Sequence, residues 1–226
     1  MKHFRNRIEA GQLLAVQLQE YVGHPDVLVL ALPRGGVPVA YEIAKVLQAP
    51  LDLCLVRKLG VPTQPELAMG AIASGGVMVL NEGVLQSLHI SQDALTEVAA
   101  QEQQELKRRD RAYRGEQPFP DLRDRSLIVV DDGIATGSTM RAAVTALRTH
   151  QPKQIIIAVP VAPPQIDQMF QAVADRVVCL IQPDSLSSIG MWYDDFSQTD
   201  DDEVRELLQR SRQEMVDKKS SCEISG

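Results

Sequence analysis

Short, uninterrupted apolar runs alternate along this sequence with stretches whose apolar residues follow helical spacing. Apolar runs without polar alternation are typical of strands buried on both faces of a parallel sheet. We expect such strands at 27–32, 51–56, 127–130, 154–161 and 176–181. Helical spacing or helix-start signals mark residues 4–22, 37–47, 91–114, 140–149, 164–174 and 200–216. This order predicts an α/β fold, with a mostly parallel central sheet flanked by helices.

Two segments add to this basic pattern. Residues 70–73 and 77–80, joined by a Ser-Gly-Gly turn, predict a short antiparallel hairpin. Residues 91–114 begin with a serine cap and predict a long exposed helix, whose charged run at 107–111 is expected to be a solvated face. We expect one domain over 1–216, with a core at about 25–181, a helical insertion at about 84–120, a small C-terminal hood with a helix at 182–216, and a flexible tail at 217–226.

Composition limits the possible functions of the chain. Its 226 residues are 44% apolar and 23% charged, as in globular proteins. A net charge of −7 argues against nucleic acid as the main partner. Cys54 and Cys179 lie in apolar runs without metal-ligand spacing and are expected to be small buried hydrophobes. Since no stretch has the roughly 18 apolar residues of a membrane helix and no signal peptide is evident, we expect a cytoplasmic protein without a membrane partner.

The most informative segment covers residues 127–139. Asp131 and Asp132 follow an apolar strand, at the end of the sheet where ligands of open α/β folds bind, and their carboxylates can accept hydrogen bonds from a vicinal diol. A turn of small residues follows and opens into a helix, so its amides and hydroxyls can surround a phosphate. The turn consists of Ala135, Thr136, Gly137, Ser138 and Thr139. A diol beside a phosphate indicates a ribose 5-phosphate; the alternative is a plain strand-to-helix connection with an aspartate cap.

Residues 127–139 resemble the signature of the type I phosphoribosyltransferases, which use phosphoribosyl pyrophosphate (PRPP). The resemblance implies that Asp131 and Asp132 hold the ribose 2- and 3-hydroxyls and that residues 135–139 hold the 5-phosphate. Residues 32–37 are similar to the pyrophosphate loop of the family, which implies that Arg34, Gly35 and Gly36 bind pyrophosphate and that the Pro33–Arg34 peptide is cis. Over about 25–185 the chain looks similar to bacterial predicted phosphoribosyltransferases whose acceptor is not assigned.

Residues 57–66 follow the second strand and are rich in glycine and proline, which predicts a loop. The resemblance implies a flexible cover that closes over PRPP, in which Lys58, as a catalytic residue, or Arg57 supplies a cation to the departing pyrophosphate. The alternative is a surface loop with solvated cations. Ala135 stands where hypoxanthine- and guanine-using members carry an aspartate, and residues 135–137 look more like the adenine-using branch, in which a glutamate of the mobile loop is implicated. That resemblance implies Glu66 as the candidate for handling the base proton; the alternative is an ordinary surface glutamate.

Aromatic residues gather at 187–196, after the last strand. Trp192 and Tyr193 could stack on a planar base, or they could form a plug that packs the C-terminal helix onto the core. Asp194 or Asp195 could help to hold Mg²⁺, the alternative being ordinary exposed acids.

The resemblance implies Mg²⁺-dependent transfer of a phosphoribosyl group from PRPP to a nitrogenous base, of the nucleobase salvage type, with release of pyrophosphate. Mg²⁺ would be bound mainly through PRPP, and the family leads us to expect a homodimer. One alternative is a non-catalytic regulator that senses PRPP or a nucleotide with the same fold. Another is a helper subunit whose helix at 91–114 mainly forms an interface.

Overall fold

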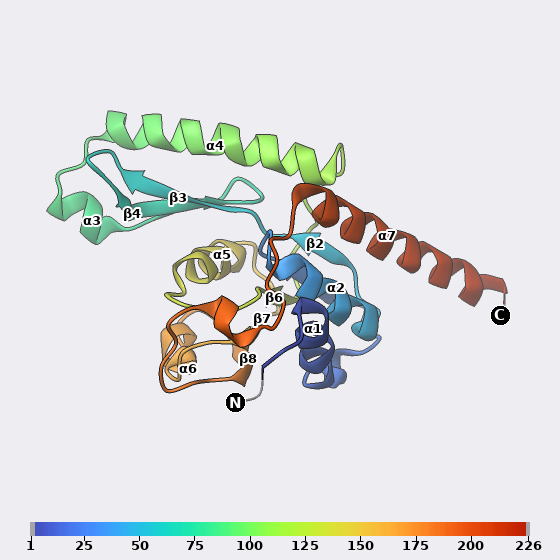
Figure 1. The fold of residues 1–226 in the computed structure, drawn as a ribbon. Helices are drawn as coiled ribbons and strands as arrows, with labels where there is room; N and C mark the ends of the chain where they lie inside the picture. Colours follow the sequence, from blue (N-terminus) through green and yellow to red (C-terminus); the bar gives the residue numbers. More distant parts are fainter. Residues whose placement is uncertain (1–2, 225–226) are drawn as a thin grey trace.

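The structure of the chain, a computed structural model, describes residues 3–224 and the side chains of residues 3–218. A five-stranded parallel sheet forms its centre, in the order β2-β1-β6-β7-β8 (Figure 1). Its strands are β1 (Val27–Ala31), β2 (Leu51–Leu53), β6 (Ser126–Val130), β7 (Gln154–Val161) and β8 (Arg176–Ile181). The predicted parallel α/β fold is confirmed. The apolar run at 51–56 is divided, because Val56 already begins the next strand, β3.

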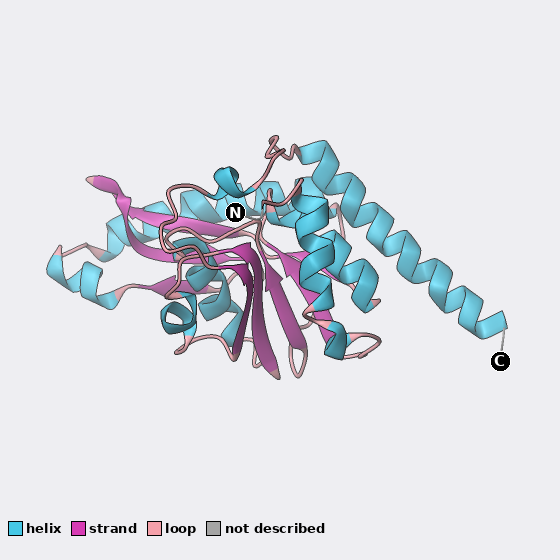
Figure 2. Cartoon of the chain, turned by 60° about the horizontal axis from the view of Figure 1, so that its bottom comes forward, coloured by secondary structure: helices cyan, strands magenta, loops and turns pink. Residues whose placement is uncertain are grey.

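Helices cover both faces of this sheet, which explains the unbroken apolar runs. Val27, Val29 and Ala31 of β1 join one core with α1 (Arg7–Val16) and α2 (Gly36–Leu47). Leu28 and Leu30 of the same strand join a second core, with α5 (Ser138–Arg148) and α6 (Ile166–Phe170). Figure 2 shows the strands lying between these helices. Successive side chains of a strand point to opposite faces, so each face of β1 requires an apolar set of its own.

A separate lobe stands over one end of the sheet (Figure 1). It holds a three-stranded antiparallel sheet of β3 (Val56–Val61), β4 (Gln64–Ala73) and β5 (Met78–Leu80). Helices α3 (Glu82–Ser87) and α4 (Gln92–Arg114) complete it, and α4 buries Leu95, Ala99 and Leu106. The predicted 70–73/77–80 hairpin and the long helix after Ser91 are confirmed.

The predicted loop at 57–66 is wrong, because these residues form most of β3 and the start of β4. The two strands pair with register shifts on either side of Gly60. A β-carbon at Gly60 would lie 2.7 Å from the carbonyl oxygen of Pro65, so the close approach of the strands requires glycine there. Glycine and proline therefore belong to an irregular hairpin instead of a loop.

The remaining helices differ from expectation mainly at their ends. The first predicted helix, 4–22, is interrupted: α1 starts after its cap residue Asn6, and a separate 3₁₀ turn covers Gln19–Tyr21. The helix predicted at 164–174 is shorter, since α6 covers Ile166–Phe170. The last helix, α7 (Asp201–Ile224), extends beyond its predicted end at 216 and through part of the expected tail, whose residues 225–226 lie outside the described part. Within residues 3–224, none of the helices combines the length and the apolar character needed to span a bilayer.

Candidate functional site

The carboxyl ends of β1 and β6 meet at one edge of the central sheet. The amide of Leu32 donates to the carbonyl of Val130 at 2.8 Å, which extends the pairing of the two strands by one step. Asp131 and Asp132 follow β6 at this point, and Arg34 follows β1. The structure therefore brings together two segments that are about a hundred residues apart in the chain.

Glycine allows these two segments to touch. A β-carbon at Gly35 would lie 2.0 Å from Oδ2 of Asp132. At Gly36 it would lie 2.7 Å from the carbonyl oxygen of Val130 and 2.9 Å from Cα of Asp131. No side chain fits at either position without moving the acids. The Pro33–Arg34 peptide is cis, as the resemblance implied.

Arg7, which the sequence analysis did not identify, holds Asp132. Its Nε lies 2.9 Å and its Nη2 2.8 Å from Oδ2 of Asp132, and the two side chains are only 11% and 16% exposed. Nη1 of Arg7 also donates to the carbonyl of Ser197 at 2.7 Å, and its guanidinium lies 3.9 Å from the centre of the Phe196 ring. Because 125 residues separate Arg7 from Asp132, no spacing rule could have found this pair.

The carboxyl group of Asp131 has a different environment. Burial and the neighbouring charge of Asp132 raise its pKa well above 3.8, although a hydrogen bond from the Asp132 amide to its Oδ1 at 2.9 Å opposes this shift. On the other side of the pair, the hydroxyl of Tyr193 donates to the carbonyl of Asp132 at 2.6 Å. Burial raises the pKa of Tyr193, so this hydroxyl remains a donor. Protein contacts thus fix Asp132, whereas a ligand hydroxyl can still satisfy Asp131.

The predicted phosphate loop continues directly from these acids into α5. Ile134 is buried and its amide donates to the carbonyl of Val161 at 2.9 Å, which anchors the loop. Ala135, Thr136, Ser138 and Thr139 are exposed beyond this anchor. The cap residue Gly137 has a φ of 74° and no side chain that could cap the helix, and the Ser138 amide donates only at a long 3.5 Å to Oγ1 of Thr136, so the first turn of α5 is suited to an anion. A β-carbon at Gly137 would lie 2.8 Å from Cε of Met169.

A groove separates this loop from the lobe. Its volume is about 570 Å³, and it is lined on one side by β4, β5 and the start of α3 and on the other by α5. Polar residues along it include Asn81, Glu82, Thr136, Ser138 and Arg141. The predicted phosphate loop therefore faces, through Thr136 and Ser138, a groove that a ligand can enter.

The cations expected from the cover lie on the lobe, each paired with an acid there. Nε of Arg57 lies 2.6 Å from Oε2 of Glu102 on α4. Nζ of Lys58 lies 3.4 Å from Oε2 of Glu66 and 3.1 Å from the Glu66 carbonyl oxygen. The side chain of Glu66 is fully exposed at 101%. In this arrangement all three residues form local surface pairs.

Trp192 and Tyr193 of the hood are buried. Trp192 and Tyr193 pack in one cluster with Phe4, and the rings of Phe4 and Tyr193 are 5.4 Å apart. The amide of Phe4 donates to the Trp192 carbonyl at 2.9 Å, and the Asp194 amide donates to the Phe4 carbonyl at 2.8 Å. Both rings therefore pack against protein. Trp192 and Tyr193 form a plug, as in the second of the two alternatives, but this plug packs against the N-terminal segment at Phe4 and not against the C-terminal helix.

Candidate metal ligands are sparse in the described part of the chain. Asp194 has a side chain that is 66% exposed, with Nδ1 of His3 at 3.9 Å. The amide of Ser197 donates to Oδ1 of Asp195 at 2.9 Å. Within residues 3–224 no group of three or more histidine, cysteine, aspartate or glutamate side chains is placed to hold an ion. Cys54 is buried, as expected, and burial raises the pKa of its thiol to about 12.

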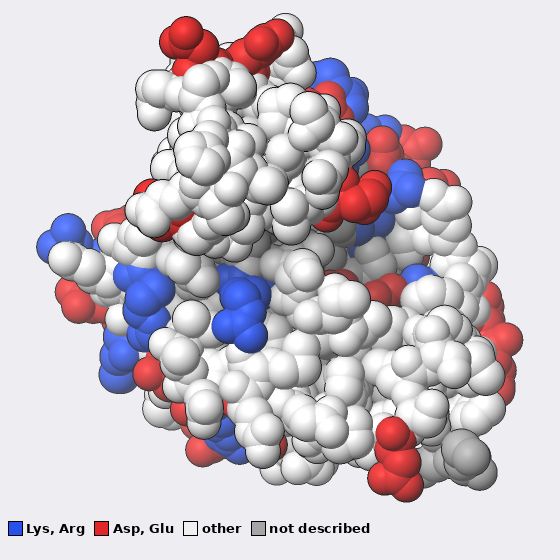
Figure 3. All heavy atoms as spheres, turned by 90° about the vertical axis from the view of Figure 1, so that its left-hand side faces the viewer, with Lys and Arg blue, Asp and Glu red and all other residues white. Residues whose placement is uncertain are grey.

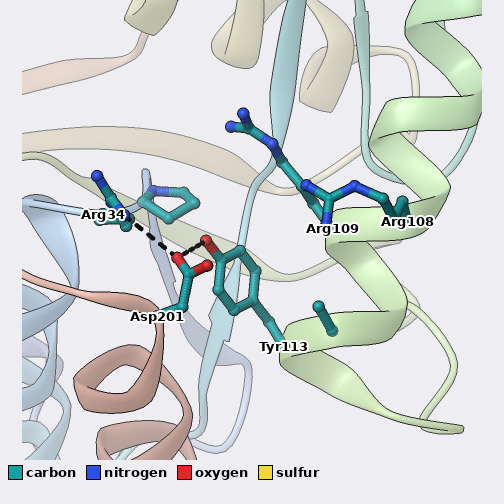
Figure 4. A pocket seen from close by; sticks show the side chains of 7 residues that line it. Arg34, Arg108, Arg109, Tyr113 and Asp201 are labelled. Atoms are coloured by element: carbon teal, nitrogen blue, oxygen red, sulfur yellow. Dashed lines mark hydrogen bonds and ion pairs between the residues drawn. The ribbon is translucent and has the colours of Figure 1, made fainter.

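Two arginines of α4, which the sequence analysis did not name as site residues, lie beside the loop after β1. Arg108 and Arg109 line a pocket of about 220 Å³ together with Arg34 (Figure 4). Nη1 of Arg34 lies 3.4 Å from Oδ1 of Asp201, and the Tyr113 hydroxyl donates to that same oxygen at 2.7 Å. Figure 3 shows lobe and body meeting at a hollow with charged side chains at its edges. The side chains of Arg108 and Arg109 are 67% and 43% exposed, so this part of the charged run is solvated as expected, and both residues also line the pocket.

Similar proteins point to one family. The family model named phosphoribosyl transferase domain matches residues 3–195. Two Mycobacterium tuberculosis proteins, from strains CDC 1551 and H37Rv and each named "Putative phosphoribosyl transferase", are 47% identical over 218 residues, which is 96% of this chain and 49% of theirs. The chain thus spans about half the length of these curated relatives. The crystal structure of TT1426 from Thermus thermophilus has a TM-score of 0.81 and 39% identity, covering 92% of this chain and 98% of that one. The chain belongs to the phosphoribosyl transferase family.

Proposed function

We propose that this chain binds PRPP across the carboxyl edge of the central sheet and catalyses Mg²⁺-dependent transfer of its phosphoribosyl group to a nitrogenous base. The observation that carries the proposal is the contact between Gly35 and Asp132, where only glycine fits. It places a loop suited to pyrophosphate beside the acid pair, and the phosphate loop follows the same acids. This arrangement supports three subsites in the order of the three parts of PRPP: pyrophosphate, ribose and 5-phosphate.

The chain's own groups suit each part of the ligand. Asp131 and Asp132 accept hydrogen bonds from the 2- and 3-hydroxyls of the ribose. The 5-phosphate is held by amides and hydroxyls at the start of α5, where the helix dipole favours an anion. These groups belong to Ala135, Thr136, Gly137, Ser138 and Thr139. The pyrophosphate lies on Arg34 and the amides of Gly35 and Gly36.

The donor set at this edge suits a Mg²⁺ ion that arrives with the substrate. Mg²⁺ usually keeps several waters and takes one or two protein carboxylates together with substrate phosphates. The two carboxylates of Asp131 and Asp132 meet that need, while the described residues offer no cluster of three ligands. When bound, the ion would neutralise charge on the departing pyrophosphate.

The reaction breaks the bond between C1 of the ribose and the pyrophosphate oxygen, and the electron pair leaves with pyrophosphate. A base nitrogen then forms its bond to C1 and loses its proton, to water or to the exposed carboxylate of Glu66. The charge of the acid pair stabilises the positive charge that develops on the ribose. Arg34 stabilises the negative charge on the leaving group, and the fixed loops hold the reacting atoms in position.

Calorimetry with PRPP and Mg²⁺ tests the binding site. A hydrogen bond to a charged group contributes about 1.5–3 kcal/mol, so Asp131→Asn and Asp132→Asn should each weaken PRPP binding about tenfold or more. Asp184→Asn, an exposed acid remote from the pair in sequence, is the matched control and should bind as the wild type does. Unchanged affinity in both acid variants would refute the site.

Turnover is tested by pyrophosphate release from PRPP across a panel of nitrogenous bases. We expect at least one base to support release in the wild type and not in Asp132→Asn. Binding of PRPP without turnover of any base would contradict the transferase proposal and favour the sensing regulator.

A further inference from the structure

Three arginines lie where the lobe meets the body. Arg34 comes from the loop after β1, and Arg108 and Arg109 come from α4; all three line one pocket of about 220 Å³ (Figure 4). Asp201, at the start of α7, lines the same pocket. Arg34, which lines the pocket, directly precedes Gly35 in the chain. The pocket therefore adjoins the edge of the sheet where Gly35 lies against Asp132.

The pocket has an excess of positive charge. Glu105 serves both arginines of α4: its carboxylate lies 2.7 Å from Nε of Arg108 and 2.7 Å from Nε of Arg109. These contacts lower the pKa of Glu105 to about 2, so it stays ionised at neutral pH. With Asp201 facing Arg34, two carboxylates face three guanidiniums. By contrast, Arg57 and Lys58 on β3 each have a carboxylate of their own.

We propose that Arg108 and Arg109, together with Arg34, bind the pyrophosphate end of PRPP, so that helix α4 supplies the cations for the leaving group. The inference rests on the proposed function and assigns residues to it. Guanidinium groups match phosphate oxygens with two parallel hydrogen bonds. Among the side chains of residues 3–218, Arg109 bonds through Nε and keeps both terminal nitrogens for a ligand. Arg108 donates to Glu105 through both Nε and Nη2, so a phosphate on Arg108 must share it with that carboxylate or displace the carboxylate.

The carboxylate of Asp201 pairs with Arg34 at the position where we propose that the pyrophosphate binds. The Arg34–Asp201 pair is 3.4 Å long and its side chains are 39% and 54% exposed, so a multivalent phosphate can displace it. The cap of α7 does not depend on Asp201, because Asp200 accepts the Glu203 amide at 2.8 Å. In Asp201→Asn the Tyr113 hydroxyl still has an oxygen to which it can donate. This variant therefore removes a competing charge without removing a structural contact.

The experiment is calorimetry with three probes in the presence of Mg²⁺: inorganic pyrophosphate, PRPP and ribose 5-phosphate. We expect Arg108→Gln/Arg109→Gln to raise the Kd for pyrophosphate and PRPP about tenfold or more, and to leave ribose 5-phosphate binding unchanged. The control is Arg111→Gln on the same helix, which removes an 80% exposed arginine paired with Glu116 and should stay within about twofold of the wild type. Asp201→Asn should bind pyrophosphate about threefold more tightly.

The outcomes separate this inference from the proposed function. If the double variant binds pyrophosphate and PRPP as the wild type does, the assignment to α4 is overturned, while a loss of PRPP binding in Asp132→Asn still supports the function. If the wild type binds pyrophosphate through these arginines but does not bind PRPP, the function fails and the anion pocket stands. Equal weakening for ribose 5-phosphate would also overturn the assignment, because a general disturbance of the site would explain it.

Discussion

The carboxyl edge of the central sheet and the lobe of β3–β5, α3 and α4 position their charged groups by different means. At the edge, backbone geometry decides: β1 and β6 are buried over their full length, and a β-carbon at Gly36 would lie 2.7 Å from the carbonyl oxygen of Val130. On the lobe, side chains decide, through exposed pairs such as Lys58 with Glu66. From this difference we expect the proposed ribose site to be held firmly, whereas the cations proposed for the leaving group can rearrange when a ligand arrives.

The largest effect is expected for Gly35→Ala, which tests whether the edge of the sheet holds Asp132 in place. The new β-carbon would lie 2.0 Å from Oδ2 of Asp132, so the loop or the acid must move. Since a displaced Asp132 would lose charged hydrogen bonds to the ribose worth about 1.5–3 kcal/mol, we expect PRPP affinity to fall about tenfold to a hundredfold in calorimetry. Gly83→Ala, whose nearest neighbour would be 3.5 Å away, is the control and should be near wild type. Normal affinity in Gly35→Ala would mean that the edge is not rigid.

Arg7→Gln tests whether α1 helps to fix the edge. It removes both contacts to the poorly exposed carboxylate of Asp132, at a cost of about 2 kcal/mol in the free energy of unfolding. In a chain of this size that lowers Tm by roughly 4–8 °C, and we expect PRPP affinity to fall about tenfold, since Asp132 loses its orientation.

The control for Arg7 is Arg5→Gln, which removes a 76% exposed side chain from the same segment. Its Tm should change little. If Arg7→Gln and Arg5→Gln melt at the same temperature, the Arg7 contact does not hold Asp132.

Asp131→Asn sharpens the comparison through the pH dependence of stability. Burial and the charge of Asp132 raise the pKa of Asp131 in the folded chain above 3.8, so ionisation at neutral pH disfavours folding. The stability that its protonated form contributes is present below pH 3.8 and is lost as the pH rises through the raised pKa. The variant should therefore melt above the wild type at pH 7, on the order of 2–4 °C for about 1 kcal/mol, and the difference should shrink toward acid pH. A constant difference at all pH values would contradict this account.

The smallest effect is expected for Lys58→Gln on the lobe. Lys58 is 44% exposed and already paired with Glu66, so its loss should change PRPP affinity by no more than about twofold. Pyrophosphate release at saturating PRPP provides the second readout. A tenfold loss of turnover would show that the hairpin closes over the leaving group and that Lys58 acts there.

The parts of the site that could be predicted from the sequence are those encoded in one continuous segment. Residues 127–139 place two acids and a phosphate loop at the end of one strand, so local backbone geometry gathers them. The central sheet could be predicted in the same way, because each of its strands is a continuous, mostly apolar run. Gly60 and Pro65 misled the prediction because their usual occurrence in loops concealed an irregular hairpin.

The missed residues come from distant parts of the chain. Arg7 reaches Asp132 across 125 residues, and Arg108 meets Arg34 only because α4 packs over the end of the sheet. No local pattern specifies such a meeting, since it depends on how whole elements pack. Likewise, Trp192 could be placed in a hydrophobic plug, but its partner Phe4 lies at the other end of the chain.

The most direct measurement is a crystal structure of the chain with PRPP and Mg²⁺. The account predicts the ribose hydroxyls within hydrogen-bond distance of Asp131 and Asp132, the 5-phosphate on the first turn of α5, and the pyrophosphate between Arg34 and the α4 arginines. PRPP bound elsewhere, or bound with its ribose turned away from the two acids, would contradict it.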